Sequence, residues 1–258
     1  MSNSDPVLEG LRGLAVAMTD ELRDSVLDGV GLADNHCVLD SEIGEVRVAF
    51  NRHGVSFLSD ATDPEEFARR FADRLGGRPL GAEASPPKGL TAALRTGRGR
   101  AVDADLRTMS DFQRLVLQAA RGIPVGEVRP YSWVAQRIGR PNAVRAVGSA
   151  LGANPVPILI PCHRVIRSDG ATGQYLFGSD TKDALLRDEG ANLDEVRDLH
   201  ARGYRYVGSD RTGIFCDPSC HSARRITESD RVLLRGQDAA ESAGMRPCKH
   251  CQPVPAAA

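Results

Sequence analysis

The chain has 258 residues, 41% of them hydrophobic, and a formal net charge of −1, so it is long enough for two or three domains with buried cores. No run of about 18 apolar residues occurs, and no basic region precedes an apolar stretch near the N-terminus, so we expect no membrane span, no secretory signal and a cytoplasmic location. Disulfides are rare in the cytoplasm, and the six cysteines are therefore expected to serve chemistry or metal binding.

Charge is unevenly distributed along the chain. Residues 1–75 hold 7 Arg and Lys against 15 Asp and Glu, whereas residues 121–170 hold 7 Arg against only Glu127 and Asp169. Residues 202–251 also lean basic, with 9 Arg and Lys against 6 Asp and Glu. Basic segments within a nearly neutral chain are typical of a nucleic-acid surface, although an ordinary solvated face has a similar composition.

The N-terminal third is predicted to contain a helix, then strands, then a second helix. Apolar residues recur near helical spacing over residues 7–33. Alternating apolar residues predict strands at residues 38–40, 46–50 and 55–58. Asp63-Pro64 predicts the start of the next helix, because aspartate is a favoured N-cap and proline a favoured first helical residue.

The middle of the chain is predicted to be helical. Ser110 is the expected N-cap of a helix that ends near Gly122, a short helix starts at Ser132, and Asn142 is expected to cap the next. Two short helices joined by a glycine-containing turn are typical of a helix-turn-helix motif, and equally of two ordinary core helices. Further helices are expected at residues 182–187 and, capped by Asp194, up to Gly203.

The stretch most indicative of chemistry is Pro161-Cys162-His163-Arg164, which follows the apolar run Val156-Pro157-Ile158-Leu159-Ile160. We interpret the run as a buried strand that holds a cysteine beside a histidine. A thiol is nucleophilic as the thiolate, and a neighbouring base helps it to ionise. Taken alone, however, a buried structural cysteine is the commoner occurrence.

Residues 126–189 resemble the catalytic domain of the O6-alkylguanine-DNA alkyltransferases, also called methylated-DNA–protein-cysteine methyltransferases. Several segments in one order and at one spacing are more specific than a single motif. The matching segments are Gly126-Glu127-Val128, Tyr131-Ser132, Arg145-Ala146-Val147-Gly148, Asn154-Pro155-Val156-Pro157, Ile160-Pro161-Cys162-His163-Arg164-Val165, Gly173-Gln174-Tyr175, Leu185-Leu186 and Glu189-Gly190.

The resemblance implies a set of catalytic residues and no cofactor in this domain. Cys162 would be the methyl acceptor, and His163 would take its proton through a bridging water. Glu189 would orient His163 and stabilise its charged form, as in a catalytic triad. Asn154 would brace the turn beneath the cysteine, although it could also be a plain turn residue. A thioether product is stable, so the reaction would be stoichiometric and self-inactivating.

The same resemblance implies that the partner is double-stranded DNA with alkylated bases, and that the damaged base is rotated out of the duplex. Tyr131 matches the tyrosine that contacts the phosphate of the rotated nucleotide. Arg145 matches the arginine that fills the vacated space, although an exposed helical arginine needs no such role. Tyr175 matches the residue that hydrogen-bonds the flipped base. Leu176 departs from the family pattern and makes the pocket wall more apolar.

The four remaining paired cysteines have the spacing of a metal site. Cys216 and Cys220 are separated by three residues, and Cys248 and Cys251 by two. Two close pairs suit tetrahedral zinc thiolate coordination, with unliganded thiols or a disulfide as the alternative. We expect one zinc ion, structural or reactive. Cys37 has no cysteine near it in the sequence and is expected in the core.

The flanks of these cysteines resemble the zinc domain of the Ada proteins. By that resemblance Cys216 would be both a ligand and a second methyl acceptor, for DNA methylphosphotriesters, because zinc keeps a sulfur ionised and nucleophilic. Asp217 stands where that family usually has arginine, which places negative charge beside a thiolate that must face a DNA phosphate.

These resemblances imply an α+β fold built from several units. We expect a ribonuclease-H-like α/β N-terminal domain, a winged helix-turn-helix-like alkyltransferase domain and a small four-cysteine zinc domain, in a monomeric protein. The expected division is a helical segment at residues 1–35, the ribonuclease-H-like domain at 36–107, the catalytic domain at 108–195 and the zinc domain at 196–258.

Three functional classes fit the residues to different degrees. The first is a DNA-repair methyltransferase that moves the methyl group of O6-methylguanine, or of O4-methylthymine, to Cys162. The second is a zinc-dependent DNA-binding protein with a vestigial Cys162 site, which the intact Cys162, His163 and Glu189 argue against. The third is a thiol hydrolase or acyltransferase, in which a basic helix-turn-helix would serve no purpose.

Overall fold

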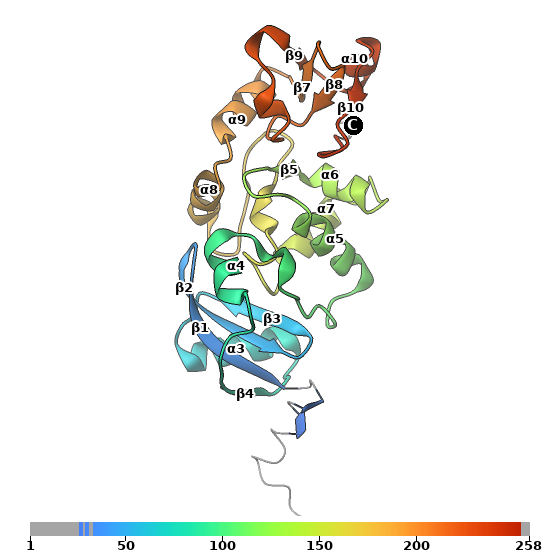
Figure 1. Ribbon diagram of the computed structural model, residues 1–258. Coiled ribbons are helices and arrows are strands. Elements are labelled where there is room, and N and C mark those ends of the chain that lie inside the picture. Colours follow the sequence, from blue (N-terminus) through green and yellow to red (C-terminus); the bar gives the residue numbers. More distant parts are fainter. Residues whose placement is uncertain (1–25, 28, 31–32, 254–258) are drawn as a thin grey trace, which may run out of the picture.

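The computed structural model describes residues 26–27, 29–30 and 33–253, so most of the predicted helix at 7–33 lies outside the described residues. Three units follow one another along an elongated molecule: a four-stranded sheet, a helical middle unit and a second four-stranded sheet (Figure 1). In the part of the chain that the structure describes, no helix is long and apolar enough to cross a bilayer.

The first sheet has the strand order β3-β2-β1-β4. Its strands are β1 (Asp34–Ser41), β2 (Gly44–Asn51), β3 (Gly54–Ser59) and β4 (Leu80–Glu83). The first three form antiparallel hairpins and β4 runs parallel to β1, which confirms the strands predicted from the alternating residues. Helix α3 (Pro64–Leu75) begins as predicted, with the Asp63 side chain accepting a hydrogen bond from the Glu66 amide.

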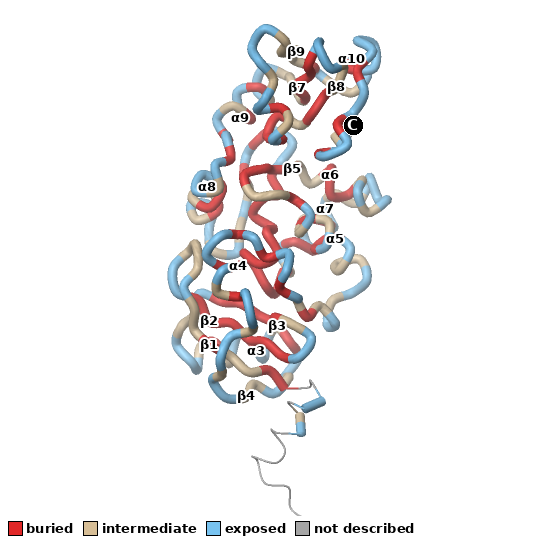
Figure 2. The backbone as a smooth tube through the Cα atoms, in the orientation of Figure 1, coloured by how far each residue is buried: buried red, intermediate tan, exposed pale blue. Residues whose placement is uncertain are grey.

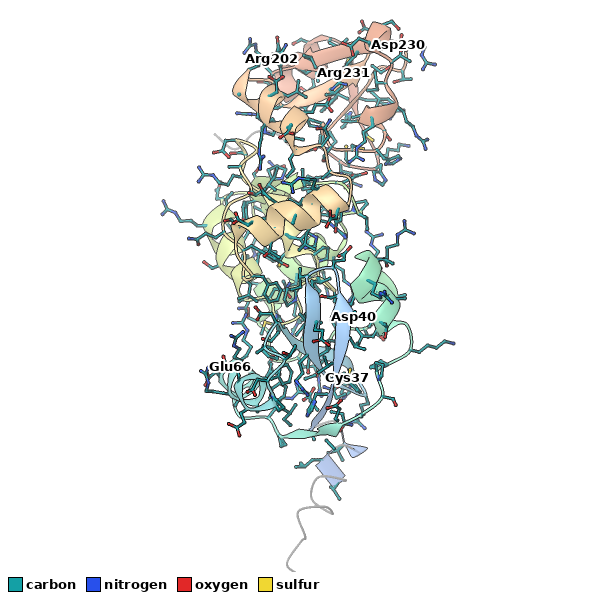
Figure 3. The ribbon with its side chains drawn as sticks, turned by 90° about the vertical axis from the view of Figure 1, so that its left-hand side faces the viewer. Cys37, Asp40, Glu66, Arg202, Asp230 and Arg231 are labelled. Carbon is teal, nitrogen blue, oxygen red and sulfur yellow. The ribbon has the colours of Figure 1, made fainter. Side chains whose placement is uncertain are left out.

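Helix α3 covers one face of this sheet through an apolar face of its own. Phe67, Phe71 and Leu75 of the helix pack against Ala49 and Phe57 of the sheet. On the first strand, Cys37 is 5% exposed and lies in the main core, as expected from the sequence. Figure 3 shows Cys37, Asp40 and Glu66 in this unit, at the opposite end of the molecule from Arg202, Asp230 and Arg231.

The middle unit is formed by short helices. They are α4 (Leu90–Thr96), η1 (Gly99–Ala101), α5 (Asp111–Arg121), α6 (Tyr131–Arg137), α7 (Val144–Gly152), η2 (Cys162–Arg164) and α8 (Ser179–Asp188). Two short parallel strands, β5 (Arg129–Pro130) and β6 (Val165–Ile166), pair between them. Ser110 caps α5 as predicted, and the two short helices predicted after it are present as α6 and α7.

Three local predictions were wrong. The run Val156–Ile160 is fully buried, as expected, but it forms a tight turn rather than a strand, with an isolated bridge between Pro157 and Ile160. Proline has no amide hydrogen to give to a ladder, and Ile158 reverses the chain with a φ of 69°. Helix α7 has Ala143 rather than Asn142 as its N-cap, and α9 (Leu193–Ala201) is capped by Asn192 rather than Asp194.

One buried core joins the first sheet to the middle unit. It includes Cys37 of β1, Leu94 of α4, Val116 of α5, Val147 of α7 and Cys162. Figure 2 shows buried stretches both in this sheet and in the helices above it. The cysteine that the sequence singles out is therefore fixed by a core to which two of the three units contribute.

The third unit is a small sheet with the order β10-β8-β7-β9. Its elements are β7 (Tyr206–Ser209), β8 (Ile214–Cys216), η3 (Ala223–Arg225), η4 (Glu228–Asp230), β9 (Arg231–Leu234), α10 (Gln237–Ser242) and β10 (Arg246–Pro247). Helix α9 connects it to the middle unit: Leu193 and Val196 pack against the middle unit, whereas Leu199 packs among the four cysteines.

Candidate functional site

Cys162 lies at the start of η2, directly after the buried turn at 156–160. Its side chain is 8% exposed. The Asn154 amide donates to Cys162 Sγ at 3.2 Å and to the Ile160 carbonyl at 2.9 Å, while Asn154 Oδ1 accepts from the Val156 amide at 3.1 Å. Asn154 therefore holds both ends of the turn and touches the sulfur itself.

His163 and Glu189 form a buried pair next to this cysteine. His163 Nε2 lies 2.8 Å from Glu189 Oε1, and neither side chain is exposed. Glu189, at the C-terminal cap of α8, also accepts from Arg164 Nε at 2.9 Å and Nη2 at 2.7 Å. Among the contacts of the described residues, His163 Nδ1 is buried and has no hydrogen-bond partner.

The ionisation of these groups follows from their burial and contacts. Burial acts to raise the pKa of Glu189, but hydrogen bonds from His163 and Arg164 outweigh it and hold that pKa at about 2. Burial lowers the pKa of His163, so its imidazole is neutral at rest. Burial raises the pKa of Cys162, against the opposing hydrogen bond from Asn154 and the charge of Lys182. At rest the site therefore holds a thiol, a neutral imidazole and a carboxylate.

A cavity of about 610 Å³ opens onto Cys162. Tyr131, at the start of α6, and Tyr175, in the loop before α8, both line it. The Tyr175 hydroxyl is buried without a hydrogen-bond partner among the described residues. The Tyr175 ring packs edge-on against the His163 ring, and the two ring centroids are 6.0 Å apart. Leu176 lines the rim and is 62% exposed, in agreement with the more apolar wall expected from the sequence.

Arg145 is the one predicted residue that the structure leaves apart from this group. It is exposed on α7 and does not line the cavity, although Gly148 and Leu151 of the same helix do. Arg145 lies three residues before Gly148 on this helix and is exposed. The remaining predicted residues, Cys162, His163, Glu189, Asn154, Tyr131 and Tyr175, are brought together.

Two functional residues of the site were missed at the level of sequence. Lys182 is 1% exposed and lines the cavity. Its ammonium group donates a hydrogen bond to the Val165 carbonyl at 2.7 Å, and burial lowers the pKa of Lys182 to about 8. Its spacing from the buried Leu185 and Leu186 could have revealed it, because a lysine three or four residues before buried leucines lies on their helix face. Arg164 was visible in the motif, but its contact with Glu189 requires the folded chain.

The four predicted zinc ligands also come together. The sulfurs of Cys216, Cys220, Cys248 and Cys251 all lie within 4.8 Å of one another, and all four residues are buried. The Asp217 amide donates to Cys251 Sγ at 3.4 Å. Hydrogen bonds from Cys216 and Cys251 lower the pKa of Cys220. Four converging sulfurs with an amide donor fit a zinc ion, which would keep them ionised and cross-link the two loops.

A second group of potential ligands lies beside the sulfurs. Glu127 Oε1 is 3.2 Å from His221 Nδ1, 3.2 Å from His250 Nε2 and 3.0 Å from the His221 amide nitrogen. Hydrogen bonds from two imidazoles and one amide to a carboxylate account for these contacts without a metal. The group joins the middle unit, which contributes Glu127, to the third unit, which contributes both histidines.

Comparison with known proteins agrees with this geometry. Residues 111–191 match the family model of the 6-O-methylguanine DNA methyltransferase DNA-binding domain, and residues 194–254 match that of the metal-binding domain of Ada. A methylated-DNA–protein-cysteine methyltransferase of Methanosarcina barkeri is 38% identical over 157 residues, which are 60% of this chain and 97% of the relative. This chain belongs to the methylated-DNA–protein-cysteine methyltransferase family.

Two further relatives place the family match in context. The bifunctional transcriptional activator/DNA repair enzyme Ada of Escherichia coli is 36% identical over 170 residues, covering 64% of this chain but 48% of Ada. The crystal structure of the Mycobacterium tuberculosis O6-methylguanine methyltransferase matches with a TM-score of 0.50 and 34% identity, over 60% of this chain and 92% of that one. The mixed α/β fold is therefore similar to a known alkyltransferase structure.

Proposed function

We propose that this chain repairs DNA by moving the methyl group of O6-methylguanine to Cys162 in a single, self-inactivating turnover. The observation that carries the proposal is a buried thiol, braced by Asn154, that faces a cavity next to the His163–Glu189 pair. Family membership supports the same reaction.

The residues of the site suggest the following sequence of steps. His163 Nδ1, which has no other described partner, takes the thiol proton through a water molecule, and Glu189 stabilises the resulting imidazolium. The Cys162 sulfur attacks the methyl carbon, the S–C bond forms and the C–O6 bond breaks. The proton finally resides on the expelled guanine, so thiol and O6-methylguanine become S-methylcysteine and guanine. No cofactor takes part in this balance.

The remaining predicted roles concern the DNA. In this proposal Tyr131 contacts the phosphate of the rotated nucleotide, and Tyr175 forms a hydrogen bond with the flipped base. Arg145 fills the space in the duplex that the base leaves. The exposure of Arg145 and the unpartnered Tyr175 hydroxyl support these assignments. The partner would be double-stranded DNA, bound by a monomer in the cytoplasm, and O4-methylthymine would be a further substrate.

The unit descriptions belong to the same proposal. A sheet with one parallel edge strand, covered by α3, supports a ribonuclease-H-like unit at residues 36–107, and helices α6 and α7 support a helix-turn-helix unit at 108–195. The cluster of four cysteines supports one zinc ion in a unit at 196–258. Cys216 as a second acceptor stays a prediction, and its side chain is 2% exposed.

A direct experiment tests the methyl transfer. The protein is incubated with a duplex containing one O6-methylguanine, and its tryptic peptides are weighed. We expect the Cys162 peptide to gain about 14 Da, the mass of one methylene, and the Cys162→Ser variant to gain nothing. An unmodified peptide together with tight DNA binding would favour the DNA-binding protein with a vestigial site. The same assay with methylphosphotriester DNA, read on the Cys216 peptide, tests the second acceptor.

A further inference from the structure

The loops that carry the four cysteines lie against the strand β5 of the middle unit. Ser219, between two zinc-ligand candidates in sequence, accepts a hydrogen bond from the Val128 amide at 3.0 Å and donates to the Val128 carbonyl at 2.8 Å. Both residues are at most 2% exposed. A single hydroxyl thus satisfies both backbone groups of a buried residue that precedes the strand.

A buried charge cluster reinforces this contact. Arg129 is 2% exposed and is paired with Glu127 of its own unit, while its Nη1 lies 3.7 Å from Asp217 Oδ1 and 3.1 Å from Ser219 Oγ. A buried guanidinium is stable only when carboxylates and acceptors surround it, and here each unit supplies one carboxylate. Asp217, which replaces the usual arginine of the Ada zinc domain, therefore has a partner inside the protein.

The second cysteine loop makes its own contact with the middle unit. Trp133 Nε1 donates to the Cys251 carbonyl at 2.9 Å and to the Gln252 carbonyl at 3.1 Å, and the indole is 8% exposed. Both loops that would bind zinc are thus fixed to the segment 126–133. A zinc ion bound by both loops would tie these two contacts together.

The segment 126–133 in turn contacts the methyl-transfer site. The Gly126 amide donates to Glu189 Oε2 at 3.3 Å, and a Cβ at Gly126 would lie 2.6 Å from the Glu189 carbonyl. Arg224 of the third unit donates to the Gly126 carbonyl on the other side. Strand β5 pairs with β6, which directly follows Cys162–Arg164, and β5 is followed at once by Tyr131.

We propose, on the basis of the methyl transfer proposed above, that the docked zinc unit positions Glu189, Tyr131 and the Cys162 turn, so that zinc binding sustains the rate of transfer at Cys162. Asp217 and Ser219 are positioning residues in this scheme. They act through the segment 126–133 and do not touch the DNA. The zinc unit is a part of the repair site rather than an independent module.

The single tryptophan of the chain, Trp133, reports the docking directly. We compare wild type, Asp217→Asn and Ser219→Ala, with Asp238→Asn as the matched control, since Asp238 is exposed on α10 of the same unit. Each protein is measured for bound zinc, tryptophan emission, DNA affinity and the single-turnover rate of methylation at Cys162. Wild type is also measured after chelation of zinc.

We expect chelation to move the emission of Trp133 to longer wavelength and to slow the transfer by roughly tenfold or more, with the DNA affinity unchanged within about twofold. Asp217→Asn and Ser219→Ala should give the same pattern with zinc still bound, Ser219→Thr should restore both signals, and Asp238→Asn should match wild type. An unchanged emission without zinc would overturn the docking. A shifted emission with a normal rate would overturn the coupling. If zinc-loaded wild type leaves Cys162 unmethylated, the proposed function itself fails and the coupling fails with it.

Discussion

His163 donates its Nε2 proton to Glu189, whose oxygen lies 2.8 Å away in a place that no solvent reaches. The direction of this hydrogen bond follows from the pKa of Glu189, which is held at about 2, so the carboxylate can only accept. The Nδ1 lone pair of His163 is therefore left free to act as a base. The carboxylate determines which nitrogen of the imidazole is available to the thiol.

Replacing Glu189 by Gln removes the charge that stabilises the imidazolium but keeps the size of the side chain. We expect the single-turnover rate of methyl transfer to fall by about 100-fold or more, because proton transfer from Cys162 loses its stabilised acceptor. Rapid-quench measurement with O6-methylguanine duplex checks this. The neighbouring Asp188→Asn, at an exposed position, is the control, and a rate near wild type in Glu189→Gln would contradict the assigned role.

The same carboxyl makes stability depend on pH. Its pKa falls from an ordinary 4.5 to about 2 on folding, so its contribution is fully present above about pH 4.5 and is lost as the pH falls toward 2. The shift corresponds to roughly 3 kcal/mol at neutral pH. Urea unfolding of wild type and Glu189→Gln should show a stability gap that narrows as the pH falls toward 3. A gap independent of pH would contradict the lowered pKa.

The sequence predicted those parts of the fold that depend on local chemistry. Asp63 and Ser110 cap helices as expected, because a side-chain oxygen meets amides three residues away. The prediction of a strand at Val156–Ile160 was wrong, because burial does not distinguish a strand from a turn. One proline lies within this run and another directly precedes it. Periodicity carries no information on how Asn154 closes this turn onto its neighbours.

The candidate site also contains some residues that the local sequence predicts and others that it does not. Cys162 and His163 are adjacent in the chain, and Asn154 is near enough for a local turn to bring it to the sulfur. Glu189 was found through family resemblance alone, since 26 residues separate it from His163. No local pattern could predict the contact between Trp133 and Cys251, which are 118 residues apart. Such contacts depend on how complete units pack.

Removal of the Asn154 side chain should affect both the turn and the sulfur. In Asn154→Ala, Ile160 and Val156 lose buried hydrogen bonds, so we expect the free energy of unfolding to fall by about 1–3 kcal/mol. Transfer should also slow, because the hydrogen bond that lowers the pKa of Cys162 is lost. Denaturant unfolding and single-turnover rates measure the two effects. Asn142→Ala, at an exposed position, should change neither.

Lys182 should make the transfer rate depend on pH. Its charge favours the Cys162 thiolate, so Lys182→Met should slow transfer by about tenfold at neutral pH. Because the pKa of Lys182 is about 8, wild type loses this charge at higher pH, and its advantage over the variant should shrink as the pH rises through that value. The transfer rates of wild type and Lys182→Met, measured across this pH range, test whether the advantage of wild type shrinks as the pH rises. The exposed Lys249→Met is the control, and a constant ratio would contradict the proposed charge effect.

The metal content distinguishes the two clusters of potential ligands. We expect one zinc ion per chain, lost in Cys248→Ser and kept in His221→Ala, because four thiolates complete a tetrahedral site. Cobalt substitution gives the readout, since cobalt bound to four sulfurs shows strong thiolate charge-transfer absorption. A second metal equivalent that disappears in His221→Ala would show that Glu127 and the histidines bind an ion rather than each other.

The burial of Cys162 also affects how fast oxidants react with it, which matters because the protein uses this nucleophile only once. Oxidants consume thiolates far faster than thiols, and the raised pKa of this buried sulfur keeps it in the slow-reacting form. We therefore expect Cys162 to react slowly with peroxide and disulfide reagents, compared with a cysteine of ordinary pKa. Cys162 therefore stays a thiol until His163 takes its proton in the transfer proposed above.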